Sequence, residues 1–365
     1  MRYLSADIIY PLNRAPIKEG VLVLDSGVII DLLESRDGLE NIEIFEGFLC
    51  PGFVNTHCHL ELSHMIDKLP EQSGLPHFIS QVPKQREESS EVIKEAIAVA
   101  DKQMQDNGIV AVGDVSNTSD TFALKSLSPI YYHTFIELFA IDSANADRVF
   151  QKGLSLQKKC QTPSSIVPHA TYSVSNLLFE KIEQHNSGEI VCLHNQETKT
   201  EDTLFLHGSG ALYNKLKVFG ELNVSGMSAL KTVLPKMPKT STLLVHNTYT
   251  SQADIQWAEA QYENLFWCTC PKANLYIEGR LPNYKNFKES VMTIGTDSLA
   301  SNHTLSIWEE VQTILAKTNL DLNTMLTWAC KNGAEFLQLK DLGSFEKGKK
   351  PGVNLIHKNK VKRLD

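Results

Sequence analysis

Short runs of apolar residues recur through most of this chain, and segments with a helical spacing of apolar residues fill most of the gaps between them. Apolar runs of this length are typical of buried strands, and longer segments in which apolar positions recur every three or four residues are typical of surface helices. The predicted strands span residues 49–57, 108–115, 131–139, 165–172, 189–195, 242–248, 264–269 and 291–297, and the clearest helices span residues 91–105, 176–184, 253–261 and 305–317.

Strands that alternate with helices indicate parallel pairing, because a parallel connection must cross back over the sheet. The eight predicted units favour a closed (β/α)8 barrel, a TIM-like α/β fold. A doubly wound open sheet is the alternative. It has less support, because the chain contains neither the glycine-rich dinucleotide fingerprint nor the Walker phosphate loop.

The two ends of the chain have a different pattern. Residues 19–24 and 28–33 are apolar runs on either side of Asp25-Ser26-Gly27, which is typical of a β-hairpin turn. Residues 353–356 form another short apolar run after a glycine-containing turn. We therefore expect a small β-sandwich domain built from residues 1–49 and 343–365, with the catalytic barrel at residues 50–342.

Composition narrows the function classes. The hydrophobic fraction of 42% and the charged fraction of 21% are those of a globular protein. The formal net charge of -8, with only a short basic cluster at residues 347–350, argues against a nucleic-acid partner. No apolar run suits a signal peptide or a membrane span, so we expect a cytoplasmic protein without a membrane partner. The seven scattered cysteines indicate reduced thiols.

The first predicted strand of the barrel ends with two histidines, His57 and His59, separated by one residue. Alternate side chains of a strand share a face, so both imidazoles can reach one metal ion, whereas Cys58 points to the other face. This arrangement predicts a metal site with nitrogen and oxygen ligands.

Other predicted strands also end in residues that can bind metal or transfer protons: His169, His194, His246 and Asp297. A single histidine at a strand end is more often structural, but five of the eight predicted strands end in this way. Functional residues of a (β/α)8 barrel collect at the carboxyl ends of its strands. The pattern therefore predicts one site at that end of the barrel.

The ordered set of His-x-His, His, His and Asp resembles the amidohydrolase superfamily, in its branch of deaminases and chlorohydrolases, which includes guanine, cytosine and aminodeoxyfutalosine deaminases. The resemblance implies one divalent metal ion, zinc or iron. Relatives with two metal ions commonly use a bridging lysine on the fourth strand, and residues 164–170 contain no lysine. One metal ion is therefore favoured over two. The implied metal ligands are His57, His59, His194 and Asp297.

The resemblance also implies the catalytic residues Glu197, His246 and Asp297. Glu197 follows His194 by three residues, where a carboxylate can carry a proton to a ring nitrogen of the substrate. The resemblance allows His246 to be either a metal ligand or a base, and we assign it to catalysis. Asp297, together with His246, would orient the attacking water.

Four residues are candidates for substrate binding: Glu61, His169, Asn302 and His303. The expected substrate is a small amino-substituted N-heterocycle such as a purine, a pterin or a nucleoside-like compound, and relatives often form homodimers. One alternative keeps the fold but acts on a C–Cl, N-alkylamine or amide bond. A second alternative is a barrel that binds metal without catalysis.

Overall fold

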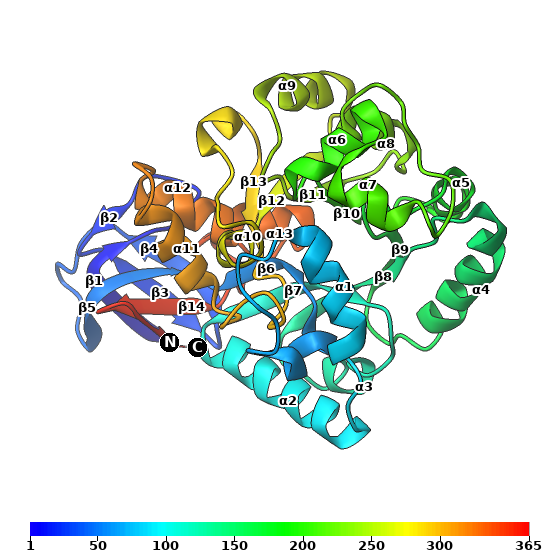
Figure 1. The fold of residues 1–365 in the computed structure, drawn as a ribbon. Coiled ribbons are helices and arrows are strands. Elements are labelled where there is room, and N and C mark those ends of the chain that lie inside the picture. The colour runs from blue at the N-terminus through cyan, green and yellow to red at the C-terminus, as the bar shows by residue number, and fades with distance from the viewer. Residues whose placement is uncertain (365) are drawn as a thin grey trace.

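The computed structural model describes residues 1–364, which form a mixed α/β protein with parallel strands (Figure 1). Each predicted strand has a counterpart in two four-stranded parallel sheets, although the first is shorter than predicted. One sheet contains β6 (Phe53–Cys58), β7 (Ile109–Ser116), β8 (Tyr131–Leu138) and β9 (Ser164–Pro168), and the other contains β10 (Val191–Asn195), β11 (Thr242–His246), β12 (Leu265–Thr269) and β13 (Met292–Ile294).

One strand prediction needs correction. Residues 49–57 do not form one strand, because β5 (Ile42–Pro51) ends before Gly52 and β6 begins after it. A Cβ at Gly52 would lie 2.3 Å from Val110 Cγ1 and 2.7 Å from the carbonyl oxygen of Pro351, so only glycine fits at this change of direction. Residues 49–51 therefore belong to the sheet of the chain termini.

The two parallel sheets meet through isolated bridges in the described part of the chain. Cys58 bridges Asp297 on one side and Ala170 bridges His194 on the other. The structure therefore has two sheets in place of the predicted continuous closed sheet. The short length of β13 explains part of this difference, because it ends at Ile294, well before the residue that pairs with Cys58.

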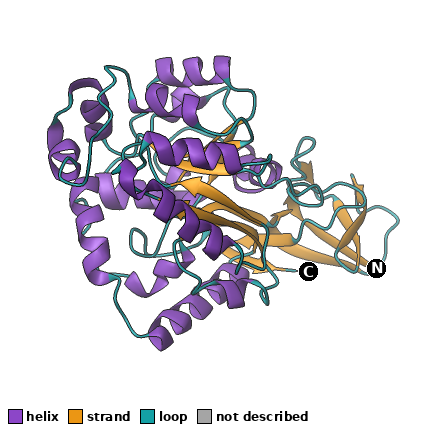
Figure 2. Ribbon diagram, turned by 90° about the vertical axis from the view of Figure 1, so that its right-hand side faces the viewer, coloured by secondary structure: helices purple, strands orange, loops and turns teal. Residues whose placement is uncertain are grey.

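Helices surround these sheets, and the sheet of the termini extends from one side without helices over its outer part (Figure 2). The four predicted helices are confirmed as α2 (Ser90–Asp106), α5 (Asn176–His185), α9 (Gln252–Gln261) and α11 (Ile307–Leu315). The other α-helices are α1 (Leu75–Gln85), α3 (Phe122–Lys125), α4 (Ala146–Gln157), α6 (Lys199–His207), α7 (Gly210–Leu216), α8 (Ala229–Val233), α10 (Pro271–Glu278), α12 (Leu322–Leu326) and α13 (Asn332–Phe336).

Both ends of the chain contribute to one seven-stranded sheet, in which β14 (Val353–His357) pairs antiparallel with β5 (Figure 1). The predicted hairpin is confirmed, with Ser26 and Gly27 at φ 53° and 81° in its turn. The sheet has its own apolar core. Its remaining strands are β1 (Arg2–Ile9), β2 (Ile17–Lys18), β3 (Val21–Asp25), β4 (Val28–Leu33) and β15 (Lys360–Arg363).

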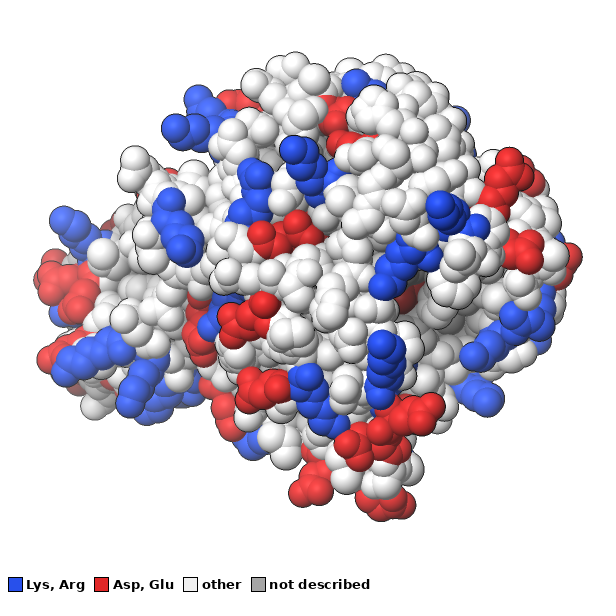
Figure 3. Space-filling view, in the orientation of Figure 1, with Lys and Arg blue, Asp and Glu red and all other residues white. Residues whose placement is uncertain are grey.

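The surface carries charges of both signs. On the face drawn in Figure 3, Lys and Arg side chains are interspersed with Asp and Glu side chains and do not gather into one basic field. Among residues 1–364, no helix combines the length and apolar character that crossing a membrane requires.

Candidate active site

A cavity of about 690 Å³ lies at the carboxyl ends of the parallel strands. Its polar lining includes the strand-end residues His59, His194 and His246 together with Glu197 and Asp297. Most of the remaining wall is apolar, with Leu62, Phe78, Val82, Phe139, Ile141 and Phe219 among its residues. A concave apolar site with a few convergent polar groups is typical of a small-molecule pocket.

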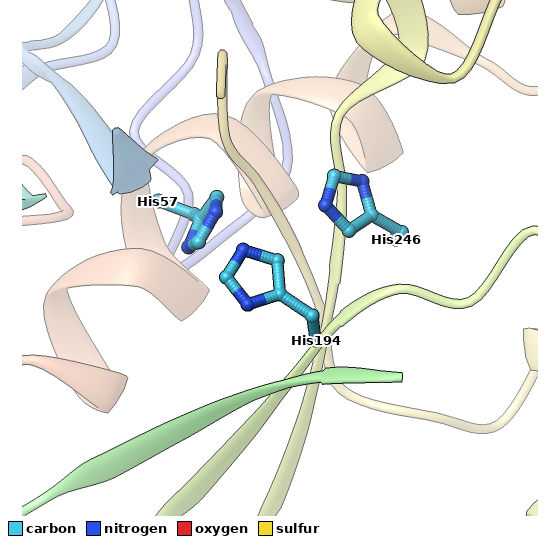
Figure 4. Close-up of side chains that lie close together, drawn as sticks. All are labelled: His57, His194 and His246. Carbon is cyan, nitrogen blue, oxygen red and sulfur yellow. The ribbon is translucent and has the colours of Figure 1, made fainter. Parts of the chain in front are cut away.

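Histidines from three strands converge at one end of this cavity. Figure 4 shows the rings of His57 on β6, His194 on β10 and His246 on β11 close together. His59 Nε2 lies 3.1 Å from His57 Nε2 and 3.3 Å from His194 Nε2. These nitrogens are close enough to share one metal ion.

Asp297 completes the cluster. Its Oδ1 lies 3.5 Å from His59 Nε2 and 3.7 Å from His57 Nε2, and its Oδ2 accepts a hydrogen bond of 2.6 Å from Ser301 Oγ. Asp297 has a left-handed backbone with φ 59°. The structure thus brings together all four residues that were predicted as metal ligands.

Burial keeps these imidazoles neutral. It lowers the pKa of His57 well below its ordinary value, and it lowers the pKa of His59 and of His194 to about 3, with neighbouring imidazoles adding to the effect. A neutral imidazole offers a lone pair to a metal ion, which a protonated one cannot. Three neutral imidazoles and a carboxylate match the nitrogen and oxygen ligands of zinc and of non-haem iron.

The orientation of His194 is fixed by its second nitrogen. Nδ1 donates a hydrogen bond of 2.6 Å to the carbonyl oxygen of His169 and lies 3.6 Å from Glu137 Oε1. The lone pair of Nε2 therefore faces His59. Such support of a histidine through its other nitrogen is common at metal sites.

Glu197 lines the cavity beside His246, and its Oε2 lies 3.8 Å from His246 Nε2. Burial holds the pKa of Glu197 well above its ordinary value, and the negative charges of Asp297 and Glu278 add to the shift. The carboxyl group therefore favours its protonated form. Its backbone N–H donates to Glu201 Oε2 at 3.1 Å, which fixes the loop after β10.

Of the predicted substrate-binding residues, His169 lines the cavity and Glu61 does not. His169 Nδ1 lies 2.7 Å from Ser173 Oγ. The Glu61 carboxylate pairs with Arg86 and accepts hydrogen bonds from the backbone N–H groups of residues 117 and 118, at 3.1 and 2.9 Å. Arg86 and the backbone therefore occupy the Glu61 carboxylate, and its contact with substrate stays a prediction.

Asn302 and His303 also lie away from the cavity lining. Asn302 Nδ2 donates to the carbonyl oxygen of Thr296 at 2.9 Å and to Glu310 Oε1 at 2.7 Å. The ring nitrogens of His303 each lie 3.0 Å from a carboxylate, of Asp67 and of Glu71. The segment after Asp297 thus places both residues outside the cavity wall, and their contact with substrate stays a prediction.

Sequence reasoning missed Glu137, Asn117 and Arg86, which all line the cavity. Glu137 is buried near the end of β8, and its Oε2 accepts a hydrogen bond of 3.0 Å from Asn117 Nδ2. Its signal in the sequence is a lone carboxylate near the end of an otherwise mainly apolar predicted strand. Arg86 follows α1 and has no comparable signal.

Parallel strands that end in a buried cluster of histidines and an aspartate define an α/β protein with a candidate metal site. The family profile described as the Amidohydrolase family matches residues 48–363 of the chain. The chain therefore belongs to the amidohydrolase family, as its motifs predicted.

Known relatives cover most of the chain. It is 24% identical over 324 residues to an adenosine deaminase of Helicobacter pylori, covering 84% of this chain and 78% of the relative. It is 26% identical over 315 residues to an aminodeoxyfutalosine deaminase of Nitratiruptor sp., covering 80% and 76%.

Solved structures share the fold. The aminofutalosine deaminase of Helicobacter pylori, solved in complex with methylthio-coformycin, superimposes with a TM-score of 0.83 at 21% identity and full coverage of both chains. The atrazine chlorohydrolase of Arthrobacter aurescens, solved with zinc, superimposes with a TM-score of 0.74 at 15% identity, covering 97% of this chain and 86% of that one.

Proposed function

We propose that this protein is a metal-dependent aminohydrolase that replaces the exocyclic amino group of an adenosine-like nucleoside, or of a related N-heterocycle, with oxygen. The observation that carries the proposal is the position of Glu197, a carboxyl group with a raised pKa that lines the same cavity as the histidine and aspartate cluster. The names of the relatives, which are deaminases of adenosine and of aminodeoxyfutalosine, support it.

We infer that residues 52–342 form a (β/α)8 barrel and that residues 1–51 and 343–364 form a separate small β domain. The predicted boundary at residue 50 moves by two residues because β5 extends to Pro51, and residue 365 lies outside the described part of the chain. The bridges from Cys58 to Asp297 and from Ala170 to His194 support closure of the barrel, since they join β6 and β10 to the residues that follow β13 and β9. Membership of the amidohydrolase family supports the same arrangement.

His57, His59, His194 and Asp297 would hold a single divalent cation, zinc or iron. Their convergence within hydrogen-bond distances and the neutral state of the imidazoles support this assignment. When bound, such a cation lowers the pKa of a water molecule to about 7 and so makes hydroxide available at neutral pH.

The remaining groups of the cavity would move protons. Glu197 in its protonated form donates to the ring nitrogen next to the amine-bearing carbon while oxygen from water adds to that carbon. His246 Nε2 and Asp297 orient the water, and one of them accepts its proton. Return of this proton to the exocyclic amine breaks the carbon–nitrogen bond and releases ammonia, and the remaining hydroxyl proton on the added oxygen passes to the Glu197 carboxylate as the carbonyl forms. His169, on the cavity wall, would contact the substrate.

The choice of leaving group tests the proposal. Three nucleosides with amino, methylamino or chloro groups at position 6 of one purine ring are incubated with the zinc-loaded protein, and ammonia, methylamine and chloride are measured. Release of ammonia from the amino compound at the highest kcat/KM supports an aminohydrolase. Preferred release of methylamine or chloride would favour the alternative hydrolase. No product from any of the three nucleosides would contradict action on an adenosine-like nucleoside.

A further inference from the structure

A buried ion pair lies beneath the turn that follows His59. Asp114, on β7, and Lys125, at the end of α3, are 0% and 3% exposed, and the carboxylate and the ammonium are in contact. Lys125 Nζ also donates to Ser116 Oγ at 3.0 Å and to Thr134 Oγ1 at 3.2 Å. Neither charged residue lines the cavity, so the proposed chemistry does not use the pair directly.

The second oxygen of Asp114 reaches the chain next to a predicted metal ligand. Asp114 Oδ1 accepts a hydrogen bond of 2.7 Å from the backbone N–H of Leu60. Leu60 is fully buried and begins the 3-10 helix η1 (Leu60–Met65), for which His59 supplies no side-chain cap. Helix starts need an acceptor for such N–H groups, and Asp114 provides it from the neighbouring strand.

The opposite side of the same strand is held by backbone hydrogen bonds. The carbonyl oxygen of His57 accepts from the N–H groups of Thr296 and Asp297, at 3.0 and 3.1 Å. The two histidines are thus fixed between the backbone of Asp297 on one side and the side chain of Asp114 on the other.

We propose that Asp114 is a positioning residue for the metal centre: its Oδ1 holds the backbone N–H of Leu60, directly after His59, and so directs His59 Nε2 toward His57 and His194. Lys125 has the separate task of neutralising the buried carboxylate. A buried carboxylate without a partner is strongly unfavourable, which explains why a lysine with three polar partners lies at this point. The inference rests on the metal site of the proposed function.

Two double variants of the full chain separate the hydrogen-bond acceptor from the charge. Asp114→Asn with Lys125→Met removes both charges and keeps an oxygen for the Leu60 N–H. Asp114→Leu with Lys125→Met removes the charges and the acceptor. Zinc affinity is measured by competition with a chromophoric chelator, and the stability of the zinc-free proteins by thermal unfolding.

We expect the Asn/Met protein to bind zinc within about threefold of the unsubstituted protein, and the Leu/Met protein to bind it about 10 to 100 times more weakly, the usual range for lost support of a ligand. Equal affinity of two folded double variants would overturn the inference. If the protein with Asp114→Leu does not fold, the protein with Asp114→Asn can still overturn the inference, because more than tenfold weakening of zinc binding there would show that the charge, not the acceptor, matters.

Asp101→Leu is the matched control. Asp101 is also buried and accepts hydrogen bonds from Tyr132 Oη and Ser128 Oγ, at 2.6 and 2.9 Å, but has no contact with the metal cluster. This variant should unfold at a lower temperature and keep its zinc affinity. Failure of the unsubstituted protein to bind zinc would contradict the proposed function itself, which is a different result from equal binding by the two double variants.

Discussion

His246 Nδ1 donates a hydrogen bond of 2.9 Å to Asn274 Oδ1, and Asn274 Nδ2 in turn lies 3.4 Å from the carbonyl oxygen of His246. The two contacts fix the orientation of the Asn274 side-chain amide. Its oxygen can only accept a hydrogen bond. The neutral imidazole therefore carries its proton on Nδ1, and Nε2 is left as an acceptor facing Glu197. This is the tautomer that orienting a water or accepting its proton requires.

Asn274→Leu should lower kcat by about 10 to 100 times, the range typical of a lost supporting contact. The ring of His246 loses the partner that holds its tautomer, while the four proposed metal ligands are untouched. Steady-state kinetics and zinc analysis of the purified protein check this. A variant that has lost zinc in proportion to kcat would contradict the separate role of His246.

Glu197→Gln should keep its zinc and lose about 100 to 10,000 times in kcat, because the amide cannot transfer a proton to the ring. Gln has nearly the same size as Glu, so the cavity keeps its shape. Zinc analysis and ammonia release are measured on the same sample. A zinc-loaded, fully active variant would refute the proton-transfer role.

The stability of the zinc-free protein should carry a pH-dependent contribution from His59. Its pKa is about 3 in the folded protein because of burial, and its ordinary value is 6.5. Below pH 6.5 the unfolded chain binds a proton that the folded chain excludes, so this contribution to the free energy of unfolding falls as the pH falls.

Comparison with His59→Gln isolates this contribution. Burial raises the pKa of Glu201 and of Glu310 to about 8, which gives stability contributions of the opposite sign in both proteins. The free energy of unfolding of the unsubstituted protein, minus that of the variant, should decrease by up to about 1.4 kcal/mol per pH unit between pH 6.5 and 5. Urea unfolding at several pH values measures it, and a constant difference would contradict the neutral state of His59.

His303→Ala should leave kcat/KM within about twofold and change the free energy of unfolding by less than about 1 kcal/mol, because exposed ion pairs contribute little. Its side chain is 51% exposed and its carboxylate partners lie outside the cavity. Steady-state kinetics check the point. A large rise in KM would show that His303 contacts the substrate.

The sequence predicts the parallel strands and the residues at their ends, because strand periodicity places His57 and His59 on one face and the ends of parallel strands meet. Glu61 and His303 show the limit of this reasoning. Both lie outside the predicted strands, Glu61 in the 3-10 helix η1 and His303 in the segment after Asp297, where the direction of a side chain depends on tertiary partners such as Arg86 and Asp67. The division into two parallel sheets is equally beyond the pattern, since the sheets meet only through single bridges such as that between Cys58 and Asp297 in the described part of the chain.

The central claim is that one bound metal ion supports deamination, and a metal titration tests it most directly. Zinc, or ferrous iron, is added to metal-free protein while ammonia release is recorded from the best nucleoside of the leaving-group series. The account predicts a rate that rises linearly to a maximum at one metal ion per chain, with His194→Ala failing to reach that rate at the same metal concentration. Full ammonia release by protein stripped of metal, or a maximum only at two ions per chain, would contradict it.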